Sequence, residues 1–237
     1  MARGSVVDEW NKLPLGARAA LEQQWKGLAT GGLPCGSAII GPDGSVVAAG
    51  RNHSYVPPGE IGTRAQLPLQ NNRLAHAELN ALALIPTRTD HATLTLWSTQ
   101  HPCLMCAGAV RFTGIGGVRF IADDPSDHSP AESIKATHGD VPYEALGSPF
   151  WWTASNLLFL YNSAVQQGEE ARNLKSNLSR YPLLVGLTLR LAKFDALGPL
   201  ARSSVPLASA LEPHASAIRE ASEDSGVKSG IKLDNRA

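Results

Sequence analysis

The feature that most constrains this chain is a group of metal-binding side-chain types split between two short segments. His76-Ala77-Glu78 forms the first segment and Pro102-Cys-Leu-Met-Cys106 the second, with 27 positions from His76 to Cys103 (103 − 76). Cys103 and Cys106 lie one helical turn apart, so a helix that begins near Pro102 directs both sulfurs to the same side. If the two segments act together, the fold must bring this helix start next to His76.

Zinc favours tetrahedral ligation by nitrogen and sulfur, and a catalytic zinc site uses three protein ligands and one water. His76, Cys103 and Cys106 supply three such ligands. Glu78 is then left as a carboxylate beside the water, where it can take up a proton and pass it on. A negative charge is favoured at a helix N-terminus, which lowers the pKa of both thiols toward the form that binds metal.

Other interpretations of the two cysteines stay open at this point. A lone C-x-x-C is also typical of a structural zinc site or a redox pair. A structural site needs a fourth strong ligand, and Cys35 lies in an apolar strand context. His91 and His101 are the remaining candidates for that ligand.

The hydrophobic pattern of the N-terminal half predicts helices and strands in the order α-β-β-α-β-α-β. The expected elements are a helix over 17–28, a hairpin of strands 38–40 and 46–48, a helix over 75–84, a strand over 93–99, a helix over 103–111 and a strand over 118–122. This order predicts an α/β domain with helices packed on a sheet.

Past Asp123 the composition changes, and prolines, aspartates and histidines become frequent. We expect a catalytic domain over 1–127, a linker or lid with a helical extension packed on the core over 128–198, and a polar, partly flexible tail over 199–237. Apolar helical stretches are expected near 150–165 and 181–194.

Four side chains of this region allow two interpretations each. Trp151 and Trp152 could stack on a base, but aromatic clusters more often belong to a core or an interface, which we favour. Asp140 and Glu144 could supply a second acidic group from the lid, or they could be solvated loop charges.

Charge and cysteine content exclude several classes of protein. The chain has 21 basic and 21 acidic residues, without the basic excess typical of nucleic-acid binding. Three cysteines do not suggest a disulfide framework, and neither a signal peptide nor a membrane span is evident. We therefore expect a cytoplasmic protein with a small-molecule substrate and no membrane association, and we favour a small molecule over nucleic acid without excluding the latter.

The combination H-x-E…P-C-x-x-C resembles the cytidine-deaminase-like superfamily. Residues 102–110, PCLMCAGAV, resemble in particular the branch with tRNA adenosine deaminases, guanine deaminases and yeast-type cytosine deaminase. The resemblance covers about residues 17–124. It implies a three-layer α/β/α fold with a mixed, about five-stranded sheet, to which this chain adds a helical C-terminal extension. Since four strands can be placed, the fifth is expected beyond Asp124.

The resemblance also implies roles for individual residues. Zinc is carried by His76, Cys103 and Cys106, and Glu78 is the proton shuttle. The residues expected to contact substrate are Asn52, Ala77, Pro102 and His101. Without the resemblance Asn52 would be an ordinary turn residue, and His101, which stands where these branches often have glutamate, could equally be a surface histidine.

These observations predict a zinc-dependent deaminase that hydrolyses a nucleobase, a nucleoside or a related small heterocycle and releases ammonia. We also expect a homodimer. One alternative is a tRNA adenosine-to-inosine deaminase, which the neutral charge opposes. An alternative of another class is a non-catalytic structural-zinc or scaffolding protein, which Glu78 opposes because a structural site has no use for this carboxylate.

Overall fold

A computed structural model describes residues 4–54, 68–127 and 129–227, and five strands in it form one mixed sheet. The sheet has the order β2-β1-β3-β4-β5. Strand β1 is antiparallel to β2 and β3, whereas β3, β4 and β5 run parallel. The fifth strand expected beyond Asp124 is confirmed. The strands are β1 (Gly36–Ile40), β2 (Val46–Arg51), β3 (Thr95–Gln100), β4 (Gly117–Ala122) and β5 (Tyr143–Ala145).

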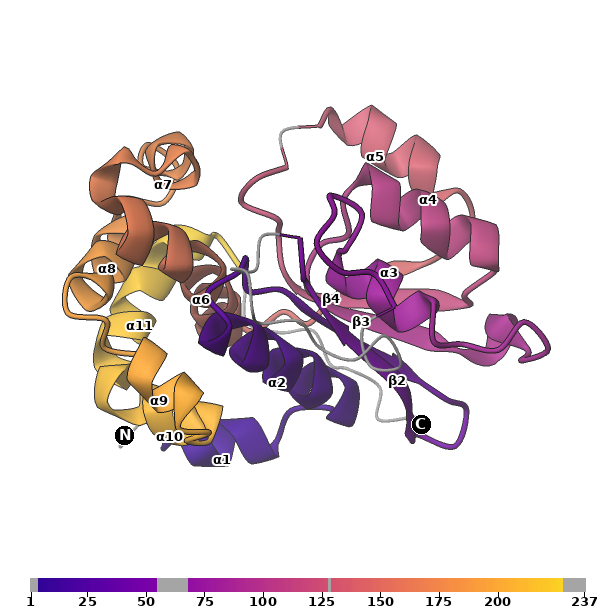
Figure 1. Cartoon of the computed structure of the whole chain (residues 1–237), viewed down its shortest axis with the longest axis horizontal. Helices are drawn as coiled ribbons and strands as arrows, with labels where there is room; N and C mark the ends of the chain where they lie inside the picture. The colour runs from indigo at the N-terminus through magenta and orange to yellow at the C-terminus, as the bar shows by residue number, and fades with distance from the viewer. Residues whose placement is uncertain (1–3, 55–67, 128, 228–237) are drawn as a thin grey trace.

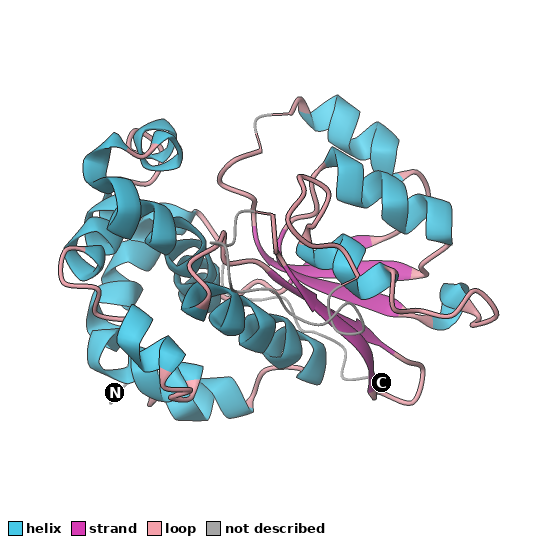
Figure 2. Ribbon diagram, in the orientation of Figure 1, coloured by secondary structure: helices cyan, strands magenta, loops and turns pink. Residues whose placement is uncertain are grey.

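Helices cover both faces of this sheet, which confirms the three-layer α/β/α arrangement (Figure 1 and Figure 2). Helices α2 and α6 pack on one face, and α3, α4 and α5 lie on the other. The α-helices are α1 (Val6–Asn11), α2 (Leu15–Ala29), α3 (Ala77–Leu82), α4 (Leu104–Thr113), α5 (Ala131–His138), α6 (Pro149–Gln167), α7 (Arg172–Asn177), α8 (Pro182–Ala192), α9 (Gly198–Arg202), α10 (Leu207–Leu211) and α11 (Ala215–Ala221).

Alternation along the strands divides the apolar side chains between two cores. Successive strand residues point to opposite faces, so Ile39 and Leu96 belong to the core under α3 and α4. Their neighbours Ile40 and Trp97 belong to the larger core under α2 and α6. The sheet is therefore buried on both faces at its centre.

Helix α6 is the central helix of the larger core. Ser148 caps its N-terminus and Pro149 occupies its first turn, a position that suits proline. Every residue over 150–162 is buried, because the helix lies between the sheet and the outer helices α7, α8 and α11. A helix that is apolar on all sides needs this kind of enclosure.

The segment over 199–227 differs from the polar tail expected there. It forms α10 and α11, which bury Leu207, Leu211 and Ile218 in the larger core, and α9 begins at Gly198. Part of the expected lid likewise forms α5 and β5. Short helices with many alanines and serines give little periodic signal, so composition suggested a tail. No helix in the described part of the chain is long and apolar enough to cross a bilayer.

Candidate metal centre and its cavity

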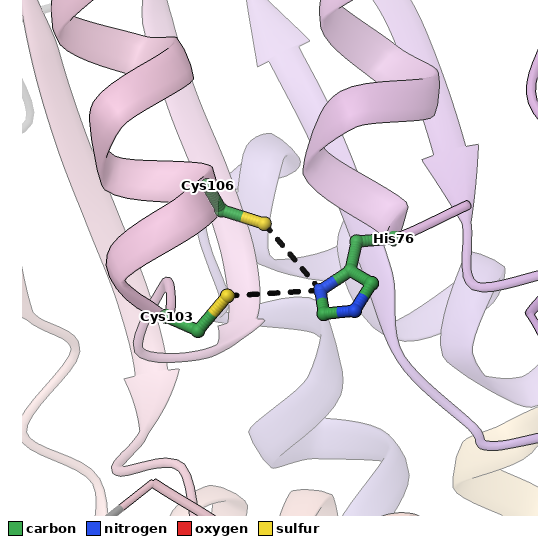
Figure 3. A group of neighbouring side chains, drawn as sticks. All are labelled: His76, Cys103 and Cys106. Atoms are coloured by element: carbon green, nitrogen blue, oxygen red, sulfur yellow. Dashed lines mark hydrogen bonds between the residues drawn. The ribbon is translucent and has the colours of Figure 1, made fainter. Parts of the chain in front are cut away.

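The three predicted ligands meet where two helices begin beside the sheet (Figure 3). His76 is the residue that precedes α3, with extended backbone, and Cys103 holds the same position before α4. Cys106 lies in the first turn of α4. Strand β3 leads directly into Pro102 and Cys103, so the central strands place the cysteines opposite the start of α3.

The spacing of the ligand atoms fits zinc. His76 Nδ1 lies 3.7 Å from Cys103 Sγ and 3.5 Å from Cys106 Sγ, and all three atoms lie within 4.8 Å of one another. Tetrahedral zinc with Zn–S near 2.3 Å and Zn–N near 2.0–2.1 Å places nitrogen and sulfur about 3.6 Å apart. The donor types and the distances are therefore compatible with a three-ligand zinc site.

The two thiols differ in acidity. Hydrogen bonding with Cys106, together with His76, lowers the pKa of Cys103 to about 4 despite its burial. The same contact, with burial and nearby negative charge, raises the pKa of Cys106 well above its usual value. The contacts therefore favour the thiolate form of Cys103, which is the form that binds metal.

Glu78 lies beside the three ligands and outside their set. It is buried, accepts a hydrogen bond from Ser98 Oγ at 3.0 Å, and lies 3.4 Å from Cys106 Sγ through its other oxygen. Burial raises the pKa of this carboxyl above its usual value. A buried carboxylate held in this way is suited to exchanging protons with a group in the cavity.

Most of the predicted site residues line one cavity of about 260 Å³. It contains His76, Glu78 and Cys103, together with Asn52 and His101. Ala77, Pro102 and Cys106 are buried next to these residues and do not line it. The remaining lining residues are Leu33, Cys35, Gln100, Asp124, Ser126, Asp127 and Phe159.

Asn52 fits both interpretations made from the sequence, as a turn residue and as a residue that contacts substrate. Its Oδ1 accepts a hydrogen bond from the Ser54 amide at 3.0 Å, as in an Asx-type turn. The residue is nevertheless only 2% exposed and lines the cavity. The turn therefore fixes Asn52 where it could contact a ligand.

Neither of the two histidines considered as a fourth ligand joins the three ligand atoms. His91 Nδ1 lies 2.7 Å from the Thr113 carbonyl oxygen, so this side chain is hydrogen-bonded to the C-terminal end of α4. His101 lines the cavity and packs edge-on against Phe120 with ring centroids 4.7 Å apart. Among the described residues only His76, Cys103 and Cys106 form a metal-binding group.

The four side chains of the C-terminal half also lie away from the cavity. Trp151 and Trp152 are each 2% exposed in the larger core, which confirms the core interpretation. Glu144 pairs with Arg119 at 3.2 Å on the surface. Asp140 is exposed.

Several cavity residues were not identified from the sequence. Asp124 follows β4, which runs parallel to β3, so it reaches the same sheet edge as Cys103. Burial raises the pKa of Asp124 to about 7. Because Asp124 follows a strand that the sequence predicts, its position could have identified it as a candidate site residue. Phe159 comes from α6, a helix that was expected, but no sequence signal marks this residue as part of the cavity.

Comparison with known proteins agrees with this geometry. Residues 13–122 match the family model of the cytidine and deoxycytidylate deaminase zinc-binding region. The match covers 110 of the 237 residues (122 − 13 + 1), so this region of the chain resembles that family.

Curated relatives cover the same part of the chain. A cytosine deaminase of Candida albicans is 32% identical over 102 residues, which is 42% of this chain and 59% of that protein. A probable cytosine deaminase of Schizosaccharomyces pombe is 30% identical over 44% of this chain and 56% of its own length. A tRNA-specific adenosine deaminase of Haemophilus influenzae is 32% identical over 45% of this chain and 56% of its own length. This chain thus spans little more than half the length of the relatives it matches.

Similar solved structures include guanine deaminase from Nitrosomonas europaea, with 20% identity and a TM-score of 0.45 over 68% of this chain and 93% of that one. A structure from work on tRNA:A34 deaminases has 22% identity and a TM-score of 0.40 over 54% of this chain and 93% of that one.

Proposed function

We propose that this protein is a zinc-dependent deaminase that hydrolyses a small nucleobase, nucleoside or related heterocycle and releases ammonia. The observation that carries the proposal is the group formed by His76, Cys103 and Cys106 at zinc spacing, with the buried Glu78 carboxylate in the same cavity. Zinc held by these three ligands would supply an acidified water at neutral pH.

The role of Glu78 follows from the balance of the reaction. A bond forms between the water oxygen and the amine-bearing ring carbon, the carbon–nitrogen bond breaks, and ammonia leaves. One proton must move from the water to the departing nitrogen. Glu78 is held by Ser98 and enclosed in the cavity, so it can accept this proton and return it without exchange with bulk water.

The other cavity residues suit a small, flat and polar substrate. The volume of about 260 Å³ lies below the usual range for drug-sized ligands, roughly 300–1,000 Å³. Asn52, Gln100 and Asp124 offer amide and carboxyl groups to the edge of a heterocycle. Phe159 and Leu33 offer apolar contacts to its faces.

The test is an ammonia-release screen over purines, pyrimidines, their nucleosides and triazine analogues with zinc-loaded protein. We expect at least one compound to be deaminated and Glu78→Gln to lower kcat by about 10²–10⁴-fold, the usual share of general acid–base catalysis. Metal analysis should find about one zinc per chain in both proteins, because Glu78 is not a ligand. Full activity in Glu78→Gln, or no turnover of any compound, would contradict the proposal. Inactivity with a fourth protein ligand on the zinc would support a structural-zinc protein.

Editing of tRNA adenosine is the second candidate, because one relative is a tRNA-specific adenosine deaminase. Equal numbers of acidic and basic residues give this chain no general attraction to RNA. Binding of tRNA that weakens steeply with salt, together with inosine formation, would favour this alternative. The expected homodimer remains a prediction that light scattering can test.

A further inference from the structure

A second, larger cavity lies away from the candidate metal centre. Its volume is about 620 Å³, within the usual range for small-molecule sites. It is bounded by α1, by the C-terminal half of α2, by the end of β2, and by the segment from α9 to α10. Its wall includes Trp10, Trp25, Leu207 and Ala208, together with the cations Lys26 and Arg51.

Apolar and aromatic groups form most of the wall. The Trp25 indole N–H already donates to the Val205 carbonyl at 2.8 Å, so the ring presents its carbon surface. Trp10 contacts Trp151 of the core with ring centroids 5.5 Å apart, which fixes one side of the cavity. Leu207 and Ala208 of α10 complete the apolar lining.

The charged groups of this cavity are predominantly cationic. Arg51, Lys26 and Arg202 line it, against one carboxylate, Glu22. Arg202 is paired with Asp195 at 3.0 Å. Neither Lys26 nor Arg51 has an ion pair among the described residues.

Arg51 is the strongest indication of a ligand. Its Nε is buried without a hydrogen-bond partner in the described part of the chain. Leaving a donor of a charged group buried and unpaired is costly, so this guanidinium gains from an anion beside it, which can reach it through the part of the side chain that lines the cavity. A guanidinium binds carboxylate or phosphate through two parallel hydrogen bonds, which makes Arg51 a specific partner for such an anion.

We propose that this cavity binds a small amphipathic anion, in which a carboxylate or phosphate head pairs with Arg51 and an apolar body lies against Trp10 and Trp25. Lys26 adds to the positive potential at the head. The ligand should be anionic at one end because the cations outnumber the single acid Glu22, and apolar at the other because most of the wall is apolar. A neutral apolar compound would leave the guanidinium unpaired, and a cationic one would be repelled.

The experiment is a calorimetric titration of the zinc-loaded full chain with decanoate, decyl phosphate, decanol and decylammonium. We expect both anions to bind at least about tenfold more tightly than decanol, and decylammonium to bind more weakly still. Arg51→Met should lower the affinity for the more tightly bound anion by about tenfold and leave the affinity for decanol unchanged. Ala29→Trp, which fills the cavity from its wall, should abolish binding of all four compounds.

Two controls separate this result from unfolding and from general charge effects. Lys135→Met removes an exposed cation from α5, outside the cavity, and should leave every affinity unchanged. Circular dichroism and zinc content should be the same for all variants. Equal binding of decanoate, decyl phosphate and decanol, an unchanged affinity in Arg51→Met, or undiminished binding in Ala29→Trp would overturn the proposal.

Discussion

At the scale of single residues, Ser155 connects the C-terminal half of the chain to the candidate site. Its hydroxyl accepts a hydrogen bond from Gln100 Nε2 at 2.8 Å, and Gln100 lines the site cavity. The same hydroxyl lies 3.1 Å from the Thr99 carbonyl, and the Ser155 carbonyl accepts from Gln24 Nε2 at 3.0 Å. A buried network of this kind holds the Gln100 amide in one orientation.

Replacing Ser155 by Ala tests this connection. The change removes the nearest of the acceptors around the Gln100 amide nitrogen and the hydroxyl beside the Thr99 carbonyl, so we expect the free energy of unfolding to fall by about 1–3 kcal/mol. We also expect KM for the best substrate to change more than kcat, because Gln100 would contact the substrate without moving the proton. Chemical unfolding and steady-state kinetics measure these effects. Val165→Ala, at an exposed position on the same helix, should change neither quantity appreciably.

Tyr161 gives a prediction for alkaline pH. Its hydroxyl accepts a hydrogen bond from the Leu197 amide at 2.8 Å, and burial raises its pKa to about 12. The protonated form is favoured in the folded state, so this stabilisation is complete below the unfolded pKa near 10 and is lost as pH rises toward about 12.

The measurement is urea unfolding of the natural protein and Tyr161→Phe at about pH 8 and about pH 11. The stability advantage of tyrosine over phenylalanine should be smaller by about 1 kcal/mol at the higher pH. An advantage that stays constant or grows would show that the phenol ionises as easily in the folded protein as in the unfolded chain.

At the scale of elements, the contact between β2 and α3 sets the position of His76 and Glu78. A Cβ added at Gly50 would lie 2.4 Å from the Ala77 carbonyl oxygen and 2.5 Å from the Ala81 nitrogen, both in the backbone of α3. Gly50→Ala must therefore displace this helix. We expect a loss of about 1–3 kcal/mol in stability and a reduced zinc content, measured by unfolding and metal analysis.

Gly108→Ala is the matched control for this change. Gly108 lies within α4, and an added Cβ meets nothing within 4 Å. Alanine is the better helix former, so stability should rise by up to about 1 kcal/mol with zinc content unchanged. If both alanine variants behave alike, the close approach of β2 to α3 does not position the site.

Local signals explain which elements could be predicted from the sequence. The hairpin was predictable because its turn residues act locally: Asp43 Oδ1 accepts from the Ser45 amide, and Gly44 has a φ of +79°. The starts of the ligand helices were predicted to within two residues, since the expected ranges 75–84 and 103–111 compare with Ala77–Leu82 and Leu104–Thr113. That the starts of these two helices lie next to each other was expected only because both carry residue types that bind zinc.

The features that could not be predicted depend on contacts between distant segments. Strand β5 has three residues and exists through its parallel pairing with β4, so it carries no periodicity of its own. Within α6, which is buried on all sides, no pattern distinguishes Phe159 at the site cavity from the core residues around it. Its role depends on how the helix is rotated against the sheet.

At the scale of the whole molecule, the region that matches the deaminase family model depends for the burial of its sheet on the half of the chain that follows it. Helix α6 covers β3 and β4 and packs against α2, so it completes one layer of the fold (Figure 1). A chain limited to residues 1–127 would lack the helix that packs on β4, and Ile121 of the sheet would lose this cover. We expect this fragment to aggregate or to lack a cooperative unfolding transition in calorimetry. A soluble fragment that unfolds cooperatively and binds zinc would show that the layer is dispensable.

The contacts between α1 and the last helices also determine when the protein can fold during synthesis. The Val6 amide donates to Glu212 at 2.8 Å, and Arg219 donates to Glu9 at 2.7 Å, across more than two hundred positions of sequence. At ribosomal rates of about 5–20 residues per second, Val6 waits roughly 10–40 s for its partner to be made. For most of this interval, until residues 149–167 have been made, the apolar side of α2 has no α6 to cover it. The nascent chain therefore presents to chaperones a surface that the finished protein never exposes.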